Sequence, residues 1–308
     1  MEGDVRYDDV RYDSEVVDAV ERPLVVGADG SPGSLPALDW AAAEAARRGL
    51  PLRIVCASLF ERYEAGLPSA GGEELPERVL AEHVAAAAGQ RVRQAAPGLD
   101  VHAEVVPAEP VDALVEESRR ASLLVTGSSG RGAVRELLLG SVSLSVAGRA
   151  HCPVVVVRGT EENVRGSGRR VVVGVGREEE APAAVEFAVA AAQLRGCEVE
   201  AVRAWRSPQQ QADPLVVLDQ AARAYAEQAA ALLEDALRGP LERYPGVTVR
   251  RTVVEGPAHK ALVRLSAGAA LLVVGATRRH GLRGLQLGRV SHRALHHAPC
   301  PVAVVPHE

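Results

Sequence analysis

The chain has 308 residues, enough for about two domains of ordinary size. Hydrophobic residues make up 47% of the sequence and aromatic residues only 3%, so the cores must be aliphatic. The formal net charge of −5 arises in residues 2–21, which hold eight acidic residues and two arginines, and the remainder is nearly neutral. This balance argues against a nucleic-acid-binding surface, and no apolar run approaches the roughly 20 residues that span a bilayer.

Residues 1–22 are polar and acidic, and we predict a flexible tail there. They lack the basic and apolar segments of an export signal. The four cysteines stand singly, without a Cys-x-x-Cys pair, at Cys56, Cys152, Cys197 and Cys300. Together these features predict a cytoplasmic protein with reduced thiols.

From residue 23 onward, strand-like apolar runs alternate with helical patterns. We predict strands at 24–28, 52–58, 101–106, 123–126 and 153–157, and helices at 35–48, 75–94, 111–120 and 142–150. The helix at 75–94 carries Leu80, Val84, Ala88 and Val92 on one face. Such alternation is typical of a doubly wound α/β sheet, with parallel strands and helices on both faces.

The same pattern then begins again after a charged segment, 159–169, which we predict to be a linker. Trp40-Ala-Ala-Ala matches Phe187-Ala-Val-Ala 147 residues later, and Cys152-Pro-Val matches Cys300-Pro-Val 148 residues later. Anchors that hold one offset over such a distance indicate an internal duplication. We therefore predict two copies of one domain, at 23–158 and 170–308.

A glycine-rich turn, Gly127-Ser-Ser-Gly130-Arg-Gly132, follows the fourth predicted strand, and Gly140-Ser141 opens the next helix. Such a turn can present backbone N–H groups to a ligand, and a helix N-terminus adds unpaired N–H groups and a positive dipole end. The stretch therefore predicts a phosphate cradle. Arg131 is placed either to take phosphate charge or simply to lie in solvent.

The gapped glycine pattern, together with a first strand that ends in Val-Gly-Ala-Asp29-Gly-Ser31, resembles the universal stress protein family in its tandem form. The resemblance implies two tandem Rossmann-like (adenine nucleotide alpha hydrolase-like) domains, each a five-stranded parallel sheet with helices on both faces. It also implies that the last strands of the domains pair, which makes one chain an intramolecular pseudo-dimer. A homodimer of whole chains is a further expectation.

The resemblance further implies an ATP site in the first half, with Mg²⁺ accompanying the phosphates. Asp29 would hydrogen-bond the ribose, although it also suits a turn or a helix cap. Ala57 would offer backbone groups to the adenine. Gly127 and Gly130 would line the ribose and phosphates, with Arg131 beside them. The phosphates would be held by Gly140, Ser141, Val142 and Ser143.

The second half departs from this pattern at three positions, where Gly176, Arg278 and Arg289 replace Asp29, Gly130 and Ser141. We therefore predict that this half is degenerate and does not bind ATP in the usual way. Arg278, Arg279 and Arg289 leave another anion open as its ligand. His292 and His296 have the spacing of some metal pairs, but exposed helix residues are the favoured interpretation.

No catalytic set stands out in the sequence, so we predict that the protein is not an enzyme, or at most a weak ATPase. The resemblance implies a nucleotide-dependent stress sensor or regulator. The alternatives are a ligand-free pseudo-dimeric scaffold and a slow ATP hydrolase of related fold.

Overall fold

The computed structural model describes residues 22–59, 76–128, 139–159, 164, 168–176, 181–206, 215–277 and 287–307. Nearly all of the tail predicted at 1–22 lies outside these ranges. Of the candidate ligand residues, Gly130, Arg131, Arg278 and Arg279 lie outside them too.

Strands and helices alternate in both halves of the chain. The first half contains β1 (Leu24–Gly27), α1 (Leu35–Arg48), β2 (Leu52–Ala57), α3 (Pro76–Ala95), β3 (Val101–Val106), α4 (Pro110–Glu117), β4 (Leu123–Gly127), α5 (Ser141–Arg149) and β5 (Val154–Val157). The second half contains β6 (Arg170–Gly174), α7 (Ala181–Arg195), β7 (Glu198–Trp205), α8 (Leu215–Arg243), β8 (Val249–Glu255), α9 (Ala258–Leu265), β9 (Leu271–Thr277), α10 (Arg289–His297) and β10 (Val302–His307).

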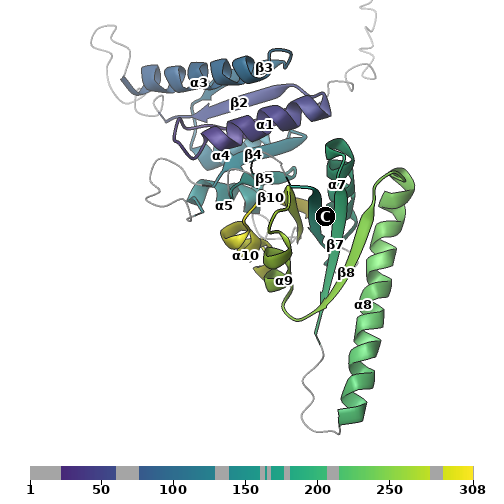
Figure 1. Cartoon of the computed structure of the whole chain (residues 1–308). Coiled ribbons are helices and arrows are strands. Elements are labelled where there is room, and N and C mark those ends of the chain that lie inside the picture. The colour runs from purple at the N-terminus through teal and green to yellow at the C-terminus, as the bar shows by residue number, and fades with distance from the viewer. Residues whose placement is uncertain are drawn as a thin grey trace, which may run out of the picture.

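All ten strands form one sheet, in the order β3-β2-β1-β4-β5-β10-β9-β6-β7-β8 (Figure 1). Every strand pair inside each half is parallel, and the two halves join where β5 and β10 pair antiparallel. At this joint Val154 pairs with Val304, Val155 with Ala303 and Val156 with Val302. Because β5 and β10 are equivalent strands of the repeat, an approximate two-fold axis passes beside Val155.

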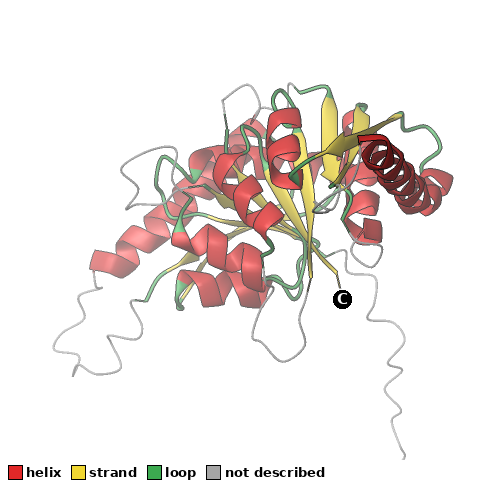
Figure 2. Cartoon of the chain, turned by 90° about the horizontal axis from the view of Figure 1, so that it is seen from below, coloured by secondary structure: helices red, strands yellow, loops and turns green. Residues whose placement is uncertain are grey.

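The helices cover both faces of the sheet, as Figure 2 shows. One buried cluster holds residues of α1, α3, α7 and α8, and a second cluster holds residues of α4, α5, α9 and α10. Each cluster contains side chains from both halves. The buried side chains are mostly valine, leucine and alanine, which suits strands that are covered on both faces. The predicted α/β fold class is therefore confirmed.

The repeat is also visible in packing contacts. A Cβ on Gly27, at the end of β1, would lie 2.9 Å from a methyl group of Leu114 on α4. A Cβ on Gly174, at the end of β6, would lie 2.7 Å from a methyl group of Leu262 on α9. Each half therefore uses a glycine so that a helix can approach the end of its first strand.

One helical face differs from the prediction. Leu80 of α3 is 54% exposed, whereas Ala81, Ala85, Ala88 and Val92 are buried. These four follow the spacing i, i+4, i+7 and i+11, and Leu80 lies about 100° away from the first of them. The apolar stripe of α3 therefore starts one residue later than the sequence suggests.

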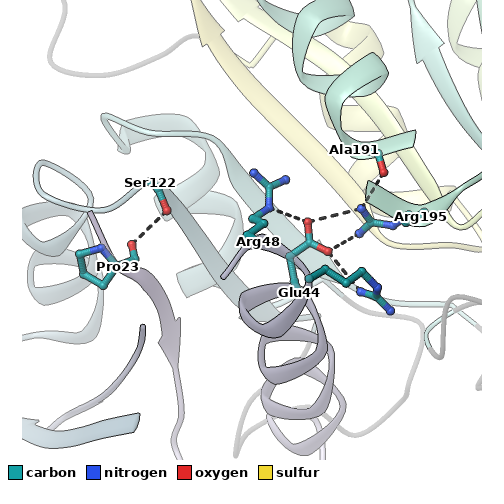
Figure 3. A network of polar contacts seen from close by, with 7 residues as sticks. Pro23, Glu44, Arg48, Ser122, Ala191 and Arg195 are labelled. Carbon is teal, nitrogen blue, oxygen red and sulfur yellow. Dashed lines mark hydrogen bonds and ion pairs between the residues drawn. The ribbon is translucent and has the colours of Figure 1, made fainter. Parts of the chain in front are cut away.

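The two halves also contact each other through α1 and α7 (Figure 3). Glu44 of α1 is 1% exposed, and its carboxylate accepts hydrogen bonds from Arg195 of α7 at 2.6 Å and from Arg48 of its own helix at 2.8 Å. Burial alone would raise the pKa of Glu44, but the nearby charges of Arg195 and Arg48 outweigh it, and the pKa is lowered. Glu44 is therefore an ionised carboxylate between the two halves.

Cation–π contacts around Glu44 are reciprocal. The Arg48 guanidinium lies 5.4 Å from the ring centre of Phe187, and the Arg195 guanidinium lies 5.7 Å from that of Trp40. Both arginines and both aromatic residues are equivalent at the 147-residue offset. Glu44 breaks the symmetry, because its equivalent is Ala191.

No helix in the described part of the chain is both long enough and apolar enough to cross a membrane.

Candidate functional site

The candidate site of the first half lies where the strand order reverses. Strands β2 and β3 extend the sheet on one side of β1, and β4 and β5 extend it on the other. The carboxyl ends of β1 and β4 are therefore followed by loops that diverge to opposite faces. Ligands of open α/β sheets bind at such a switch point.

The loop after β1 is shaped by its own polar groups. The N–H of Ser31 donates to Oδ1 of Asp29 at 3.0 Å, and the hydroxyl of Ser34 donates to the carbonyl of Ser31 at 2.9 Å. Gly30 has a φ of +75°, which favours glycine. Asp29 therefore does act as a turn residue. This bond uses one of about four acceptor directions of a carboxylate, so it is compatible with a ribose contact.

Gly127 brings the end of β4 against this loop. A Cβ at position 127 would lie 2.3 Å from the carbonyl oxygen of Gly33. Two stretches of backbone therefore touch at the switch point, and glycine is required there by packing alone. The sequence predicted only a ligand contact for Gly127 and did not predict this packing role.

The first turn of α5 is tied to the same point. The hydroxyl of Ser143 donates to the carbonyl of Gly127 at 2.6 Å, and the N–H of Gly140 donates to the carbonyl of Ser128 at 2.6 Å. In the second half Ser291 donates to Gly275 at 3.0 Å, which is the equivalent bond. Because both halves make it, the serine bond is part of the architecture. The Ser143 hydroxyl and the Gly140 N–H thus have partners within the chain, and their predicted phosphate contacts stay predictions.

Ser141 and Val142 remain as the residues whose N–H groups begin α5. Ser141 is exposed, and α5 has neither a side-chain cap nor an acidic residue in its described first turn. The first N–H groups of a helix have no partner within it and lie at its positive end. This helix start can therefore bind an anion.

Ala57 lies one strand further along. It is the last residue of β2 and pairs with Val106 of β3, whereas pairing of β2 with β1 ends at Val55. The edge of Ala57 that faces β1 is therefore not covered by that strand. The structure thus brings Asp29, Gly127 and the start of α5 together, with Ala57 beside them.

Two buried hydroxyl groups belong to the loop after β1 and to β4. Oγ of Ser31 and Oγ1 of Thr126 have no hydrogen-bond partner among the described residues. Buried polar groups are rarely left without a partner. The groups that are available to a polar ligand here are the uncapped start of α5 and the Asp29 carboxylate, which suit phosphate and hydroxyl groups respectively.

The equivalent place in the second half is a cavity of about 280 Å³. It lies at the ends of β6, β7 and β9, and its walls include Gly176, Ala204 and Gly275, which are equivalent to Asp29, Ala57 and Gly127. Gly176 supplies no carboxylate, as the sequence predicts. Arg203 of β7 also lines the cavity, which the sequence analysis did not anticipate.

Two histidines of α10 have the spacing of some metal pairs. The rings of His292 and His296 lie 4.5 Å apart, centre to centre, but no group of three or more candidate ligands exists among the described residues. Partial burial, together with the neighbouring positive groups, lowers the pKa of His296.

The described cysteines are all free thiols. Burial raises the pKa of the Cys300 thiol to about 12, so this group is not a nucleophile.

The comparisons with known proteins agree with this architecture. The model of the universal stress protein family matches residues 21–158 and 168–306. Universal stress protein Rv2005c of Mycobacterium tuberculosis (strain ATCC 25618 / H37Rv) is 38% identical over 289 residues, which cover 91% of this chain and 96% of that protein. Universal stress protein Rv2623 of the same strain is 34% identical over 288 residues, which cover 91% and 95%.

Solved structures show the same fold. The crystal structure of a universal stress protein from Archaeoglobus fulgidus DSM 4304 matches with a TM-score of 0.64 at 20% sequence identity, and covers 93% of this chain and 99% of that one. A universal stress protein in complex with cAMP is 31% identical to this chain. That match covers only 46% of this chain at a TM-score of 0.33, so it carries no argument about a ligand of this protein. From the family model and the mycobacterial relatives, the chain belongs to the universal stress protein family.

Proposed function

We propose that the first half binds ATP at the switch point between β1 and β4 and that the protein acts as a nucleotide-dependent regulator of the stress response. The observation that carries this proposal is the meeting of the Asp29 loop, the end of β4 and the uncapped start of α5 at one place. A carboxylate can accept from both hydroxyls of a ribose, and a helix start can hold phosphates.

We propose the following roles for the residues of this site. Asp29 would take the ribose, the backbone of Ala57 the adenine, and Ser141 and Val142 the phosphates. Gly130 and Arg131 belong to the proposed site by resemblance. Mg²⁺ would be held chiefly by the phosphates, because the described residues offer no cluster of metal ligands.

The two halves would act as one pseudo-dimeric unit within the chain, the first binding ATP and the second degenerate. The β5–β10 pairing and the contact of α1 with α7 support this proposal. We place the protein in the cytoplasm, where its free thiols would stay reduced. The domain limits stay those proposed, 23–158 and 170–308.

The direct experiment is to denature freshly purified protein, to separate the released nucleotides by chromatography, and to titrate the emptied protein with Mg·ATP in a calorimeter. We expect one adenine nucleotide per chain. Two per chain would show that the second half binds ATP as well. If no nucleotide is released and the titration produces no heat, a ligand-free scaffold is favoured. The continuous sheet is compatible with that function too. Steady turnover of ATP would favour a hydrolase.

Two serine variants locate the phosphates. Ser141→Ala removes an exposed hydroxyl at the start of α5 and is expected to weaken Mg·ATP binding about tenfold, the usual effect of one lost bond to a charged group. Ser143→Ala is the matched control, because its hydroxyl already donates to Gly127. It is expected to lower stability and to change the affinity less than Ser141→Ala does. The opposite ranking would return the phosphate contact to Ser143.

A further inference from the structure

The cavity of the second half has its own chemistry. It occupies the same switch point as the site of the first half, here between β6 and β9, and it opens beside the first turns of α9 and α10, where Ala258 and Val290 line it. At about 280 Å³ it is just below the usual range of small-molecule pockets. A ligand smaller than a drug-sized molecule would fill it.

The cavity and its surroundings are more positive than the equivalent positions of the first half. In the wall, Gly176 stands in place of Asp29 and Arg203 in place of Cys56. Arg289, directly before the wall residue Val290, stands in place of Ser141. One carboxylate is thus lost and two guanidinium groups are gained. The change removes the ribose acceptor and adds charge that attracts phosphate.

Arg203 is held in the wall itself. It extends from β7, and its Nη1 donates to the carbonyl of Val175 at 3.2 Å, directly after the end of β6. Both residues line the cavity. The guanidinium therefore bridges two adjacent strand ends at the point where a ligand would lie.

Further positive groups lie around the first turn of α9, which begins at the wall residue Ala258. His259, in the first turn of α9, has a lowered pKa because of partial burial and because of four neighbouring cations, Arg293, Arg289, Lys260 and Arg206. The described first turns of α9 and α10 contain no acidic residue and no side-chain cap. The positive ends of both helices thus add to the field of the side chains.

We propose that the second half binds a phosphate-bearing anion in this cavity, through Arg203, Arg289 and the starts of α9 and α10, without requiring a ribose. The inference does not rest on ATP binding in the first half. The shared chemistry is a chain of phosphate groups, which inorganic polyphosphate and nucleotides both carry. The first half would recognise a nucleoside together with its phosphates, and the second half the phosphates alone.

Trp205 allows the second half to be observed separately. The chain has two tryptophans, and Trp205 is the last residue of β7, next to Ala204 in the cavity wall. Trp40, the other, lies in the contact between the halves. Trp40→Phe leaves Trp205 as the sole emitter, and phenylalanine already occupies the equivalent position 187 in the reciprocal contact.

The experiment is a fluorescence titration of the full-length Trp40→Phe protein with tripolyphosphate, with ATP and with adenosine, at fixed ionic strength. We expect saturable changes in Trp205 emission with tripolyphosphate, weaker changes with ATP, for whose ribose Gly176 offers no acceptor, and none with adenosine. A change with adenosine and ATP but none with tripolyphosphate would overturn the proposal, because it would identify a nucleoside site. No change with any of the three would overturn it as well.

Three variants in this background complete the test. Arg203→Met and Arg289→Ser are each expected to weaken tripolyphosphate binding about tenfold or more, and serine already stands at the equivalent position 141. Arg264→Met is the control, because it removes an exposed charge from the far end of α9. Equal weakening by all three variants would show general charge attraction and would refute a built site.

A thermal-shift assay on the wild-type chain tests the same proposal without the Trp40→Phe change, in case that variant does not fold. Tripolyphosphate is expected to raise the melting temperature of the wild type and of Arg264→Met, and to raise that of Arg289→Ser much less. An equal rise in all three proteins would place the binding elsewhere and would refute the proposal. The proposal that the first half binds ATP is tested separately, by the released nucleotide and by the Ser141→Ala variant. Either proposal can therefore fail without the other.

Discussion

Gly127 illustrates how much of the site is decided by single atoms. A Cβ there would meet the backbone oxygen of Gly33 at 2.3 Å, and backbone cannot rotate away as a side chain can. The carbonyl oxygen of Gly127 also accepts the hydrogen bond from the hydroxyl of Ser143 on α5. One glycine therefore sets the distance between the loop after β1, the end of β4 and the start of α5.

We expect Gly127→Ala to lower the free energy of unfolding by roughly 1–3 kcal/mol, the common result of overpacking. Urea denaturation would measure it. Gly98→Ala is the control, because nothing lies within 4 Å of the Cβ that it adds. Equal stability of the two variants would mean that the Gly33 loop yields without cost.

At the scale of elements, the contact of α1 with α7 rests on one carboxylate. Glu44 is buried with Arg195, whose side chain is only 7% exposed, so removal of either charge leaves the other without compensation. We expect Glu44→Gln to lower the free energy of unfolding by roughly 3–5 kcal/mol. Glu82→Gln, which breaks an exposed pair with Arg78, should cost under about 1 kcal/mol in the same urea experiment. Similar losses in both variants would mean that Glu44 is not held as an ionised partner.

The same carboxylate predicts a dependence on pH. The pKa of Glu44 is lower in the folded protein than its ordinary value of about 4.3. Its contribution is therefore complete above about pH 4.3 and is lost as the pH falls through the folded pKa. The difference in stability between the wild type and Glu44→Gln should stay constant from pH 7 down to about 5 and shrink below about 4. A difference that grows on acidification would contradict the lowered pKa.

The sequence predicted these elements well because their signals are local. The period of the apolar residues and the position of Gly49, which has a φ of +68°, locate the end of α1 correctly. The contact of Glu44 with Arg195 could not be predicted in this way, since it depends on which helices meet. The 147-residue offset aligns Arg48 with Arg195 and Trp40 with Phe187. Once the two halves are known to pair, this offset identifies the four residues as candidates for a contact between α1 and α7.

At the scale of the whole molecule, the sheet and both cores continue from one half into the other. We therefore expect a single calorimetric unfolding transition for the chain. Mg·ATP at about 100 times its dissociation constant should stabilise that whole transition by about 2.7 kcal/mol. Two separate transitions, of which ATP shifts one, would mean that the halves unfold independently.

The candidate site was predictable in its location but not in its details. Its location follows from topology, because β1 and β4 flank the switch point in any sheet of this order. The bond from Ser143 to Gly127 and the reach of Arg203 to Val175 depend on side-chain directions that a sequence does not contain. Sequence reasoning therefore assigned Ser143 to a ligand and overlooked Arg203.

The position of Glu44 beside the approximate two-fold axis bears on how such a chain can evolve. In a dimer of identical subunits, a residue near the axis faces its own copy, so a buried carboxylate there would repel itself. Fusion of two copies into one chain lifts that constraint, because position 44 can be acidic while position 191 is alanine. Pairing then becomes directional. Two first halves from different molecules would bring two carboxylates together, and two second halves would bury two arginines without Glu44 as acceptor. The inequality of Glu44 and Ala191 thus disfavours exchange of halves between molecules.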